Sequence, residues 1–400
     1  VATFMNSFND IDGIPATGHK VLQRDILKGE WSWNGFVVSD WGSISEMVAH
    51  GYAEDKKHAA EIAMNAGSDM DMESYAYEAH LEKLLNENKI DISQIDEAVK
   101  RILRIKFQLG LFDDPFKYCN EQREIDNVYT KEHLAISRNI AKKSIVLLKN
   151  ENKLLPISKN VKSIAVIGPL ADDKDSPLGN WRGKAAYNSA VSLLEGVRNA
   201  IGEKTKVHYG KGVDLTVPTL EPGKNQFLYP LKFNNTDKSG IAKAVAIAKK
   251  SEIVLLAIGE NAYQTGEGRS QTNIGFLGLQ NELLEAVYKV NKNIVIVLMN
   301  GRPLDFNQKS TGRPYSNRHV TFSGYRDSPK SALYPFGFGL SYTTFSYGNL
   351  ILDKTEITTS GELKVSVDVK NTGNRVGEEV VQLYIRDLVG SLVSPIKELK

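Results

Sequence analysis

Short apolar runs alternate with amphipathic stretches along most of the chain. Residues 253–258 and 294–299 are purely apolar, and Gly35–Ser39 is a shorter run bounded by a glycine and by Asp40. The longest runs reach about six residues, whereas a membrane-spanning helix needs roughly 20. We therefore expect strands buried on both faces, and no membrane partner.

Residues 1–115 combine the strand at 35–39 with several helical patterns. Apolar positions three and four apart predict helices over Lys20–Gly29, Lys56–Asn65 and Ala76–Asn86, and from an N-cap at Ser93 to about Leu109. Strands and helices joined by short connections predict parallel β/α units. In residues 116–150, a polar stretch up to Thr130 predicts a linker, followed by a helix over Lys131–Asn150.

A second strand–helix series fills residues 151–345. The expected strands are Ser163–Ile167, Lys206–Tyr209, Ile253–Ile258 and Ile294–Met299, and the expected helices are Ser192–Ile201, Ile241–Lys250 and Leu279–Asn291. This order predicts an open parallel sheet with helices on its faces. No helical pattern follows Met299, so we expect either missing material between Phe306 and Asn307 or an irregular loop.

The hydrophobic period changes to two in residues 346–400. Leu363–Val369 alternates, Asn371–Gly373 predicts a turn, and Val380–Ile385 continues as strand. This pattern predicts the start of an antiparallel β-sandwich.

Composition and charge exclude several functional classes. The 400 residues are 41% hydrophobic and 24% charged, with a formal net charge of +2, which argues against a disordered or fibrous protein. No basic stripe is visible, so a nucleic-acid partner is not expected. The single Cys119 excludes a disulfide framework. The histidines show no metal-binding spacing, and a proline follows Gly168 where a dinucleotide motif would continue, so no metal or cofactor is expected.

Asp40 follows the buried run 35–39, where a strand ends and a helix is about to begin. In parallel β/α folds the carboxyl ends of the strands carry the active sites. The competing explanation is that Asp40 is the N-cap of the next helix. Trp41 favours catalysis, because an indole beside a carboxylate is a suitable floor for a sugar ring.

A second candidate carboxylate, Glu267, lies in the loop after the apolar run 253–258. Glycines on both sides would let this loop bring the carboxylate into a cleft, although an exposed glutamate with no function fits the same pattern. Glu260 competes with it but stands nearer the strand end. We therefore expect Glu260 to be a structural, hydrogen-bonded group.

Several sequence blocks accompany these carboxylates. Met5-Asn-Ser-Phe-Asn9 and Gly13-Ile-Pro15 precede Asn34–Trp41, and Gly266-Glu-Gly268 precedes Gly278-Leu-Gln280. Further blocks are Val297–Pro303, Tyr334–Tyr342, Asn371–Gly373 and Gly377–Val380. With these blocks, over essentially its whole length, the chain resembles glycoside hydrolase family 3, and within it the bacterial periplasmic β-glucosidases.

The resemblance implies a fold and a chemistry. The α/β fold would comprise the C-terminal part of a (β/α)8-type barrel, a parallel α/β sandwich and the start of a fibronectin-III-like domain. The activity would be that of a retaining exo-glycosidase acting on small β-glucosides or oligosaccharides in the periplasm or outside the cell. Asp40 would be the nucleophile and Glu267 the general acid/base. Met5, Phe8 and Trp41 would line the glucose pocket, and Trp181 would face Trp41.

The chain also departs from the family. Roughly the first half of the barrel is absent, with the basic and acidic residues that hold the sugar hydroxyls in relatives, so we expect a fragment or a shortened gene product. Two alternatives to a β-glucosidase stay open. One is a β-xylosidase on the same fold, and the other is a catalytically silent carbohydrate-binding protein.

Overall fold

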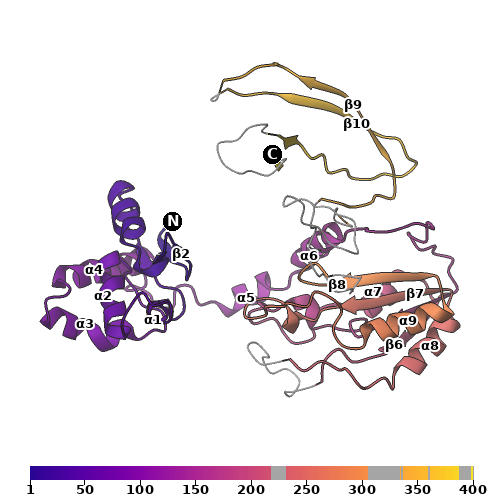
Figure 1. The fold of residues 1–400 in the computed structure, drawn as a ribbon, viewed down its shortest axis with the longest axis horizontal. Helices are drawn as coiled ribbons and strands as arrows, with labels where there is room; N and C mark the ends of the chain where they lie inside the picture. The colour runs from indigo at the N-terminus through magenta and orange to yellow at the C-terminus, as the bar shows by residue number, and fades with distance from the viewer. Residues whose placement is uncertain (218–230, 305–333, 335–336, 359–360, 387–397, 400) are drawn as a thin grey trace, which may run out of the picture. The chain divides into compact units, whose positions relative to one another are not determined.

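A computed structural model describes residues 1–217, 231–304, 334, 337–358, 361–386 and 398–399 (Figure 1). It divides into two compact units, Val1–Ala141 and Lys142–Lys400, here called unit 1 and unit 2. The boundaries expected at residues 115, 150 and 345 stay predictions. The expected junction at Phe306 and Asn307 lies outside the described residues.

Three parallel extended segments organise unit 1. Strand β1 (Thr3–Met5) pairs with β4 (Phe36–Val38), with Met5 opposite Val38, and Val38 bridges in parallel to Met70. A two-residue hairpin of β2 (Asp10–Ile11) and β3 (Ile14–Pro15) lies between β1 and the first helices. Within β4, Val37 is buried while its two neighbours are only half-buried. The expected burial of the whole run is therefore wrong at the strand's ends.

Helices cover these strands. Their bounds are Val21–Glu30, which has π-type hydrogen bonding, α1 (Ser43–Ala49), α2 (Lys56–Ala66), α3 (Ala76–Asn86) and α4 (Ile92–Gln108). Four alanines make up much of the buried face of α2, which lets α1 and α3 pack closely against it. Ile44, Met47, Met64 and Leu84 fill the centre of this core.

Two helix boundaries differ from the sequence-based expectations. Asp91, and not Ser93, caps α4, because its carboxylate accepts the Ser93 N–H while the Gln94 side chain accepts the Asp91 N–H. The expected linker also contains a helix, α5 (Glu121–Asn127), which Asn120 caps. The next helix, α6, spans Lys131–Ser144 and ends six residues before the predicted end.

Unit 2 contains a four-stranded parallel sheet in the order β6-β5-β7-β8. The strands are β5 (Ser163–Ile167), β6 (Lys206–Gly210), β7 (Ile253–Gly259) and β8 (Ile294–Met299), and the helices are α7 (Leu193–Ala200), α8 (Ile241–Lys249) and α9 (Gln280–Val290). The open parallel sheet is thus confirmed. β8 is the end strand among the described residues and leaves Ile296 40% exposed, so its expected full burial is wrong.

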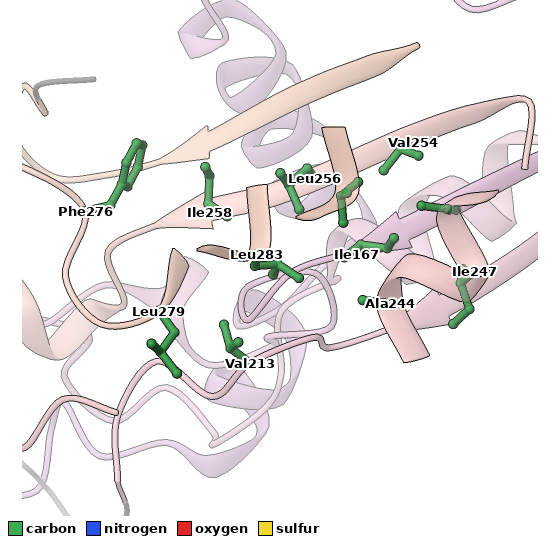
Figure 2. Close-up of a cluster of buried hydrophobic side chains, with 13 residues drawn as sticks. Ile167, Val213, Ala244, Ile247, Val254, Leu256, Ile258, Phe276, Leu279 and Leu283 are labelled. Atoms are coloured by element: carbon green, nitrogen blue, oxygen red, sulfur yellow. The ribbon is translucent and has the colours of Figure 1, made fainter. Parts of the chain in front are cut away.

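The central strands of unit 2 bury both faces. Alternate residues of β5 and β7, including Ile167, Leu256 and Ile258, pack against Ala244 of α8 and Leu283 of α9 (Figure 2). The intervening residues of the same strands pack on the opposite face with Leu194 of α7. This alternation follows from the two-residue period of a strand.

The C-terminal residues form antiparallel pairs. β9 (Phe345–Leu352) pairs with β10 (Val365–Asn371), and β11 (Tyr384–Ile385) pairs with β12 (Glu398–Leu399). β9 was not expected, and of the predicted strand Val380–Ile385 only the last two residues are paired. The α/β class is established, whereas the barrel and fibronectin-III-like assignments stay predictions. No helix within the described ranges is long and apolar enough to span a membrane.

Candidate active site

Asp40 lies at the carboxyl edge of the parallel segments of unit 1. It follows β4 by two residues, and β4 lies between β1 and the segment around Met70. Backbone hydrogen bonds from Ser39 N–H to the Met70 carbonyl and from Gly42 N–H to the Met72 carbonyl, both 2.8 Å, continue this pairing past the strand. The turn that carries Asp40 is therefore anchored on one side.

The Asp40 side chain does not cap the following helix. The N-cap of α1 is Gly42, which has a φ of 71° and contributes no side-chain bond. The Asp40 Oδ1 atom accepts the N–H of Trp41 at 2.7 Å, and its backbone carbonyl accepts the N–H of Ser43. The N-cap explanation for Asp40 is therefore wrong, and the Oδ2 atom of the half-buried carboxylate has no hydrogen-bond partner among the described residues.

Two of the predicted sugar-contacting residues of unit 1, Met5 and Trp41, lie at the same edge. Met5 is the last residue of β1, opposite Val38, and is 57% exposed. Trp41 directly follows Asp40 and is 64% exposed, and Phe8, three residues after β1, is half-buried. Exposed aromatic and thioether groups beside a carboxylate suit the apolar face of a sugar ring.

A network of hydrogen-bonded polar side chains joins the segments that form this edge. Asn6 donates from Nδ2 to Ser68 Oγ at 2.9 Å, and the Thr17 hydroxyl lies within hydrogen-bonding distance of both Asn6 Oδ1 and Ser43 Oγ. Ser68 in turn donates to the Thr17 carbonyl or to Gln23 Oε1, each 3.0 Å away. Sequence reasoning did not identify this network, because its members are scattered and individually ordinary.

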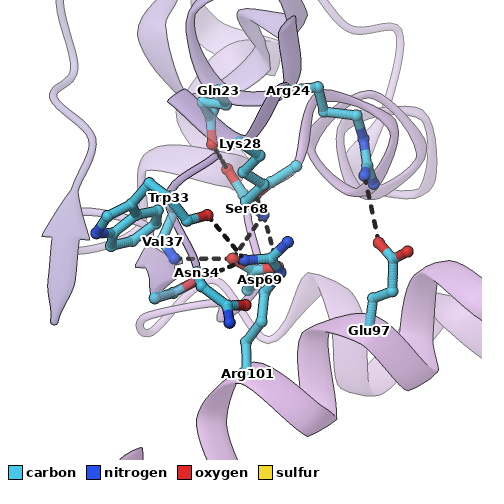
Figure 3. A network of polar contacts seen from close by, with 12 residues as sticks. Gln23, Arg24, Lys28, Trp33, Asn34, Val37, Ser68, Asp69, Glu97 and Arg101 are labelled. Atoms are coloured by element: carbon cyan, nitrogen blue, oxygen red, sulfur yellow. Dashed lines mark hydrogen bonds and ion pairs between the residues drawn. The ribbon is translucent and has the colours of Figure 1, made fainter. Parts of the chain in front are cut away.

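A buried ion pair fixes β4 itself. The Lys28 ammonium lies 2.7 Å from the Asp69 carboxylate, with both side chains less than a tenth exposed (Figure 3). Asp69 also accepts the N–H of Val37 in β4 at 2.8 Å. Burial lowers the pKa of Lys28, and the nearby carboxylate opposes that effect only in part. The pair therefore joins β4 to two other segments of unit 1.

In unit 2 the two candidate loops leave the sheet at its switch point. From β5 the chain runs through α7 outward to β6, and from β7 it runs through α9 outward to β8 on the other side. In open parallel sheets, ligands bind at the carboxyl ends of the two strands whose connections diverge. The loop after β5 carries Trp181 and the loop after β7 carries Glu267, so both loops start at the position that this rule favours.

Glu267 stands at the exposed tip of its loop. Gly266 and Gly268 on either side have φ angles of 96° and 68°, which favour glycine. The Glu267 carboxylate makes no hydrogen bond or ion pair with any residue that the structure describes. Trp181 is 74% exposed. Both side chains are accessible to a ligand.

Glu260 differs from Glu267 in its burial and in the contacts of its carboxylate. It is only 6% exposed, its Oε1 atom lies 3.1 Å from Nε of Arg302, and its Oε2 atom accepts the Gly301 N–H. A buried carboxylate paired with an arginine is not accessible to a substrate. The expectation that Glu260 is a structural, hydrogen-bonded group is confirmed.

Two further residues, to which the sequence analysis assigned no role, hold these loops. Gln280 is fully buried and bonds both the N–H and the carbonyl of Gly259, the last residue of β7. Asn180, next to Trp181, donates to the Ala262 and Thr265 carbonyls of the Glu267 loop. The Trp181 and Glu267 loops are thus joined directly.

The structure therefore groups the predicted residues within each unit. Met5, Asp40 and Trp41 lie at one strand edge of unit 1, and the loops of Trp181 and Glu267 meet in unit 2. The roles of these residues, and the pairing of Asp40 with Glu267, stay predictions. Among the described residues no group of three or more His, Cys, Asp or Glu could hold a metal ion.

Residues 1–105 match the glycosyl hydrolase family 3 N terminal domain, and residues 145–321 match the C-terminal domain of the same family. The chain is 32% identical to a periplasmic beta-glucosidase of Salmonella typhimurium, over 99% of this chain and 60% of that protein. It is 34% identical to a beta-xylosidase of Formosa agariphila, over 100% of this chain and 61% of the relative.

Solved structures give the same relationship. A mutant beta-glucosidase from Listeria innocua in complex with laminaribiose superimposes with a TM-score of 0.83 at 30% identity, covering 99% of this chain and 59% of that one. The chain thus spans about 60% of the length of these relatives. Domain matches on both sides of the unit boundary, together with the parallel sheet and the full-length superposition, place this chain in glycosyl hydrolase family 3.

Proposed function

We propose that this chain carries the catalytic carboxylates of a retaining, exo-acting glycosidase that removes terminal non-reducing β-D-glucosyl residues. The observation that carries the proposal is the placement of Asp40. Its carboxylate is half-buried at the carboxyl edge of three parallel segments, and its one described hydrogen bond is to the N–H of Trp41. Family membership and β-glucosidase relatives support the same chemistry.

In the proposed reaction Asp40 attacks the anomeric carbon while Glu267 protonates the departing glycosidic oxygen. Water, deprotonated by Glu267, then releases the sugar from Asp40 with retained configuration. This mechanism requires the two carboxyl groups about 5–5.5 Å apart. Within its own unit, each carboxylate is accessible: Glu267 is exposed at a loop tip and Asp40 is half-buried at a strand edge.

The substrate proposal rests on the aromatic groups and on the relatives. Trp41 and Trp181 each offer an exposed indole face, which suits stacking on pyranose rings. Structures of the Listeria innocua enzyme hold laminaribiose, glucose or isofagomine. We propose small β-glucosides or oligosaccharides as substrates and, from the periplasmic relative, a periplasmic or secreted location.

A β-xylosidase is the second candidate. The 34% identity to the Formosa agariphila beta-xylosidase, across the whole chain, favours it specifically. Comparing aryl β-glucosides with aryl β-xylosides separates the two. The third reading, a catalytically silent carbohydrate-binding protein, predicts sugar binding with no turnover of either substrate.

The test of the proposal is Glu267→Ala. An acid catalyst matters most when the leaving group is poor, so cleavage of cellobiose-like substrates should fall by about a hundredfold or more. Substrates with very acidic phenol leaving groups should still form the glycosyl-enzyme. Added azide should then restore turnover and give a β-glycosyl azide, detectable by NMR, because azide needs no general base.

Glu285 of α9 provides the matched control, since it is also an exposed carboxylate of unit 2. Glu285→Ala should behave like the wild type on every substrate and give no azide product. A Glu267→Ala variant that lost the same fraction of activity on all leaving groups, or formed no azide adduct, would remove Glu267 from the acid/base role.

A further inference from the structure

We propose that Arg302, oriented by Glu260, is a positioning residue for the loop that carries Glu267. This inference rests on the proposed function, because it assigns the residue that holds the acid/base in place. The Arg302 Nη2 atom donates to the carbonyls of Gln264 and Arg269, the latter at 2.9 Å. These carbonyls lie on either side of Glu267, so one guanidinium closes the base of its loop.

The Arg302 guanidinium is in turn paired with the buried Glu260 carboxylate. Glu260 leaves β7 with its N–H bonded to the Met299 carbonyl at the end of β8, and its side chain is 4% exposed. A charge this deeply buried needs a paired partner, which Arg302 supplies through Nε at 3.1 Å. The Nε–H forms no hydrogen bond with any described acceptor, so Glu260 holds the guanidinium by charge. Because the guanidinium is planar and rigid, this ion pair on its Nε side leaves Nη2 to donate to the loop.

The turn around Arg302 packs directly on the loop. A Cβ atom added to Gly301 would lie 2.6 Å from the Thr265 side chain, so the backbone after β8 touches the loop. On the opposite side Asn180 donates to the Thr265 carbonyl at 3.0 Å, and a Cβ on Gly266 would clash with Asn180. The loop base is thus held from both neighbouring strands, while residues 266–268 at its tip are exposed.

This arrangement has a catalytic consequence. Proton transfer needs the acid within hydrogen-bonding reach of the departing oxygen, about 2.6–3.2 Å. A displacement of about 1 Å costs on the order of a hundredfold in rate. Loosening the loop base should therefore mimic, in part, the loss of Glu267 itself.

Hydrogen exchange on the full chain tests the contact without requiring turnover. In Arg302→Ala, amides of residues 261–269 should exchange about tenfold faster or more, while β5 and β7 keep their protection. Arg302→Lys should do the same, because the lysine side chain is one bond shorter and its single nitrogen cannot pair with Glu260 and reach the two loop carbonyls at once. If Arg302→Ala fails to fold, hydrogen exchange of Arg302→Lys provides the same test.

Asn291→Ala is the matched control, because it removes a comparable pair of side-chain-to-carbonyl hydrogen bonds elsewhere in unit 2 and so reports any general destabilisation of the unit. Asn291 donates to the Ala248 and Ser251 carbonyls at the opposite edge of the sheet, so its loss should leave residues 261–269 at the wild-type exchange rate. Unchanged exchange of 261–269 in both Arg302 variants would overturn the proposal. So would an increase spread evenly over β5 and β7.

Kinetics add the catalytic readout. The Arg302 variants should lower kcat by about a hundredfold for cellobiose-like substrates, with KM little changed, and by less than tenfold for aryl glucosides with very acidic phenols. Equal losses on both substrates would contradict positioning of the acid. Glu267→Ala, measured in parallel, separates the acid/base role of Glu267 from the positioning role of Arg302. If Glu267→Ala shows no dependence on the leaving group, the proposed function fails. The hydrogen-exchange result would still show whether Arg302 holds the loop.

Discussion

At the scale of single residues, Asp40 is held in place mainly through its own backbone carbonyl. Its carbonyl accepts from Ser43 N–H and from the Ser39 hydroxyl, while its carboxylate bonds only the neighbouring Trp41 N–H among the described residues. The fold therefore makes little use of the Asp40 carboxylate. A substitution at this position should change chemistry far more than stability.

The position of Asp40 could be predicted because an apolar run ending in a polar residue marks a strand end. Arg302 and Asn180 could not, since their partners are backbone carbonyls of a loop about 30 or more residues away in sequence. Every residue has a backbone carbonyl, so the sequence does not show which carbonyl a distant side chain will bond. Glu260 was distinguishable from Glu267 only by its position nearer the strand end and by the glycines that stand on both sides of Glu267.

Tyr77 provides a pH-dependent test at the residue scale. Its hydroxyl donates to the Ser68 carbonyl at 2.7 Å, and burial of that hydroxyl, with Asp71 and Asp69 nearby, raises the pKa of Tyr77 well above its usual value. The stability it contributes is complete below the unfolded-state pKa of about 10 and is lost as pH rises toward the folded-state pKa.

Tyr77→Phe should therefore cost about 1 kcal/mol near pH 7. The difference between wild type and variant should shrink as pH rises above about 10. Urea unfolding at a series of pH values measures it, and the other tyrosines cancel in the comparison. A difference that stayed constant up to pH 11 would argue against a buried, neutral hydroxyl.

At the scale of elements, strands and helices were predicted correctly where one or both of their faces are buried, because burial requires a regular pattern of apolar residues. β5 and β8 have the predicted bounds, and β7 is apolar throughout because both its faces are covered. α5 buries no residue and β9 is almost wholly exposed, so neither shows a hydrophobic period. α5 depends instead on the Asn120 cap, a signal of one residue that the polar stretch conceals.

The Lys28–Asp69 pair tests how β4 is held. Lys28→Met would leave the buried Asp69 carboxylate with the Val37 N–H as its one partner among the described residues, which should destabilise unit 1 by about 3–5 kcal/mol. Adding Asp69→Asn removes the unpaired charge but keeps an acceptor for Val37, so the double variant should recover part of the loss.

Tryptophan fluorescence during urea unfolding can follow this effect, since three of the four tryptophans belong to unit 1. A loss below about 1 kcal/mol in Lys28→Met, or a double variant less stable than the single one, would show that the ion pair does not anchor the strand.

At the scale of the whole molecule, each unit supplies one of the proposed catalytic carboxylates, and the chain covers about 60% of its relatives' length. Substrate choice tests the proposal at this level. A pocket built for glucose should favour aryl β-glucosides over aryl β-xylosides by at least about 10-fold in kcat/KM, since the loss of even one methylene contact costs about 10–200-fold. A preference for the xyloside would support the β-xylosidase reading.

The central claim is that Asp40 forms a covalent bond to the sugar. Incubation with a 2-deoxy-2-fluoro-β-glucoside bearing a good leaving group should trap the glycosyl-enzyme, since the fluorine slows its hydrolysis. Peptide mass spectrometry should then find the fluoroglucosyl group on Asp40, and Asp40→Asn should stay unlabelled. A label on another carboxylate, or hydrolysis that proceeds with inverted configuration and no label, would contradict the account.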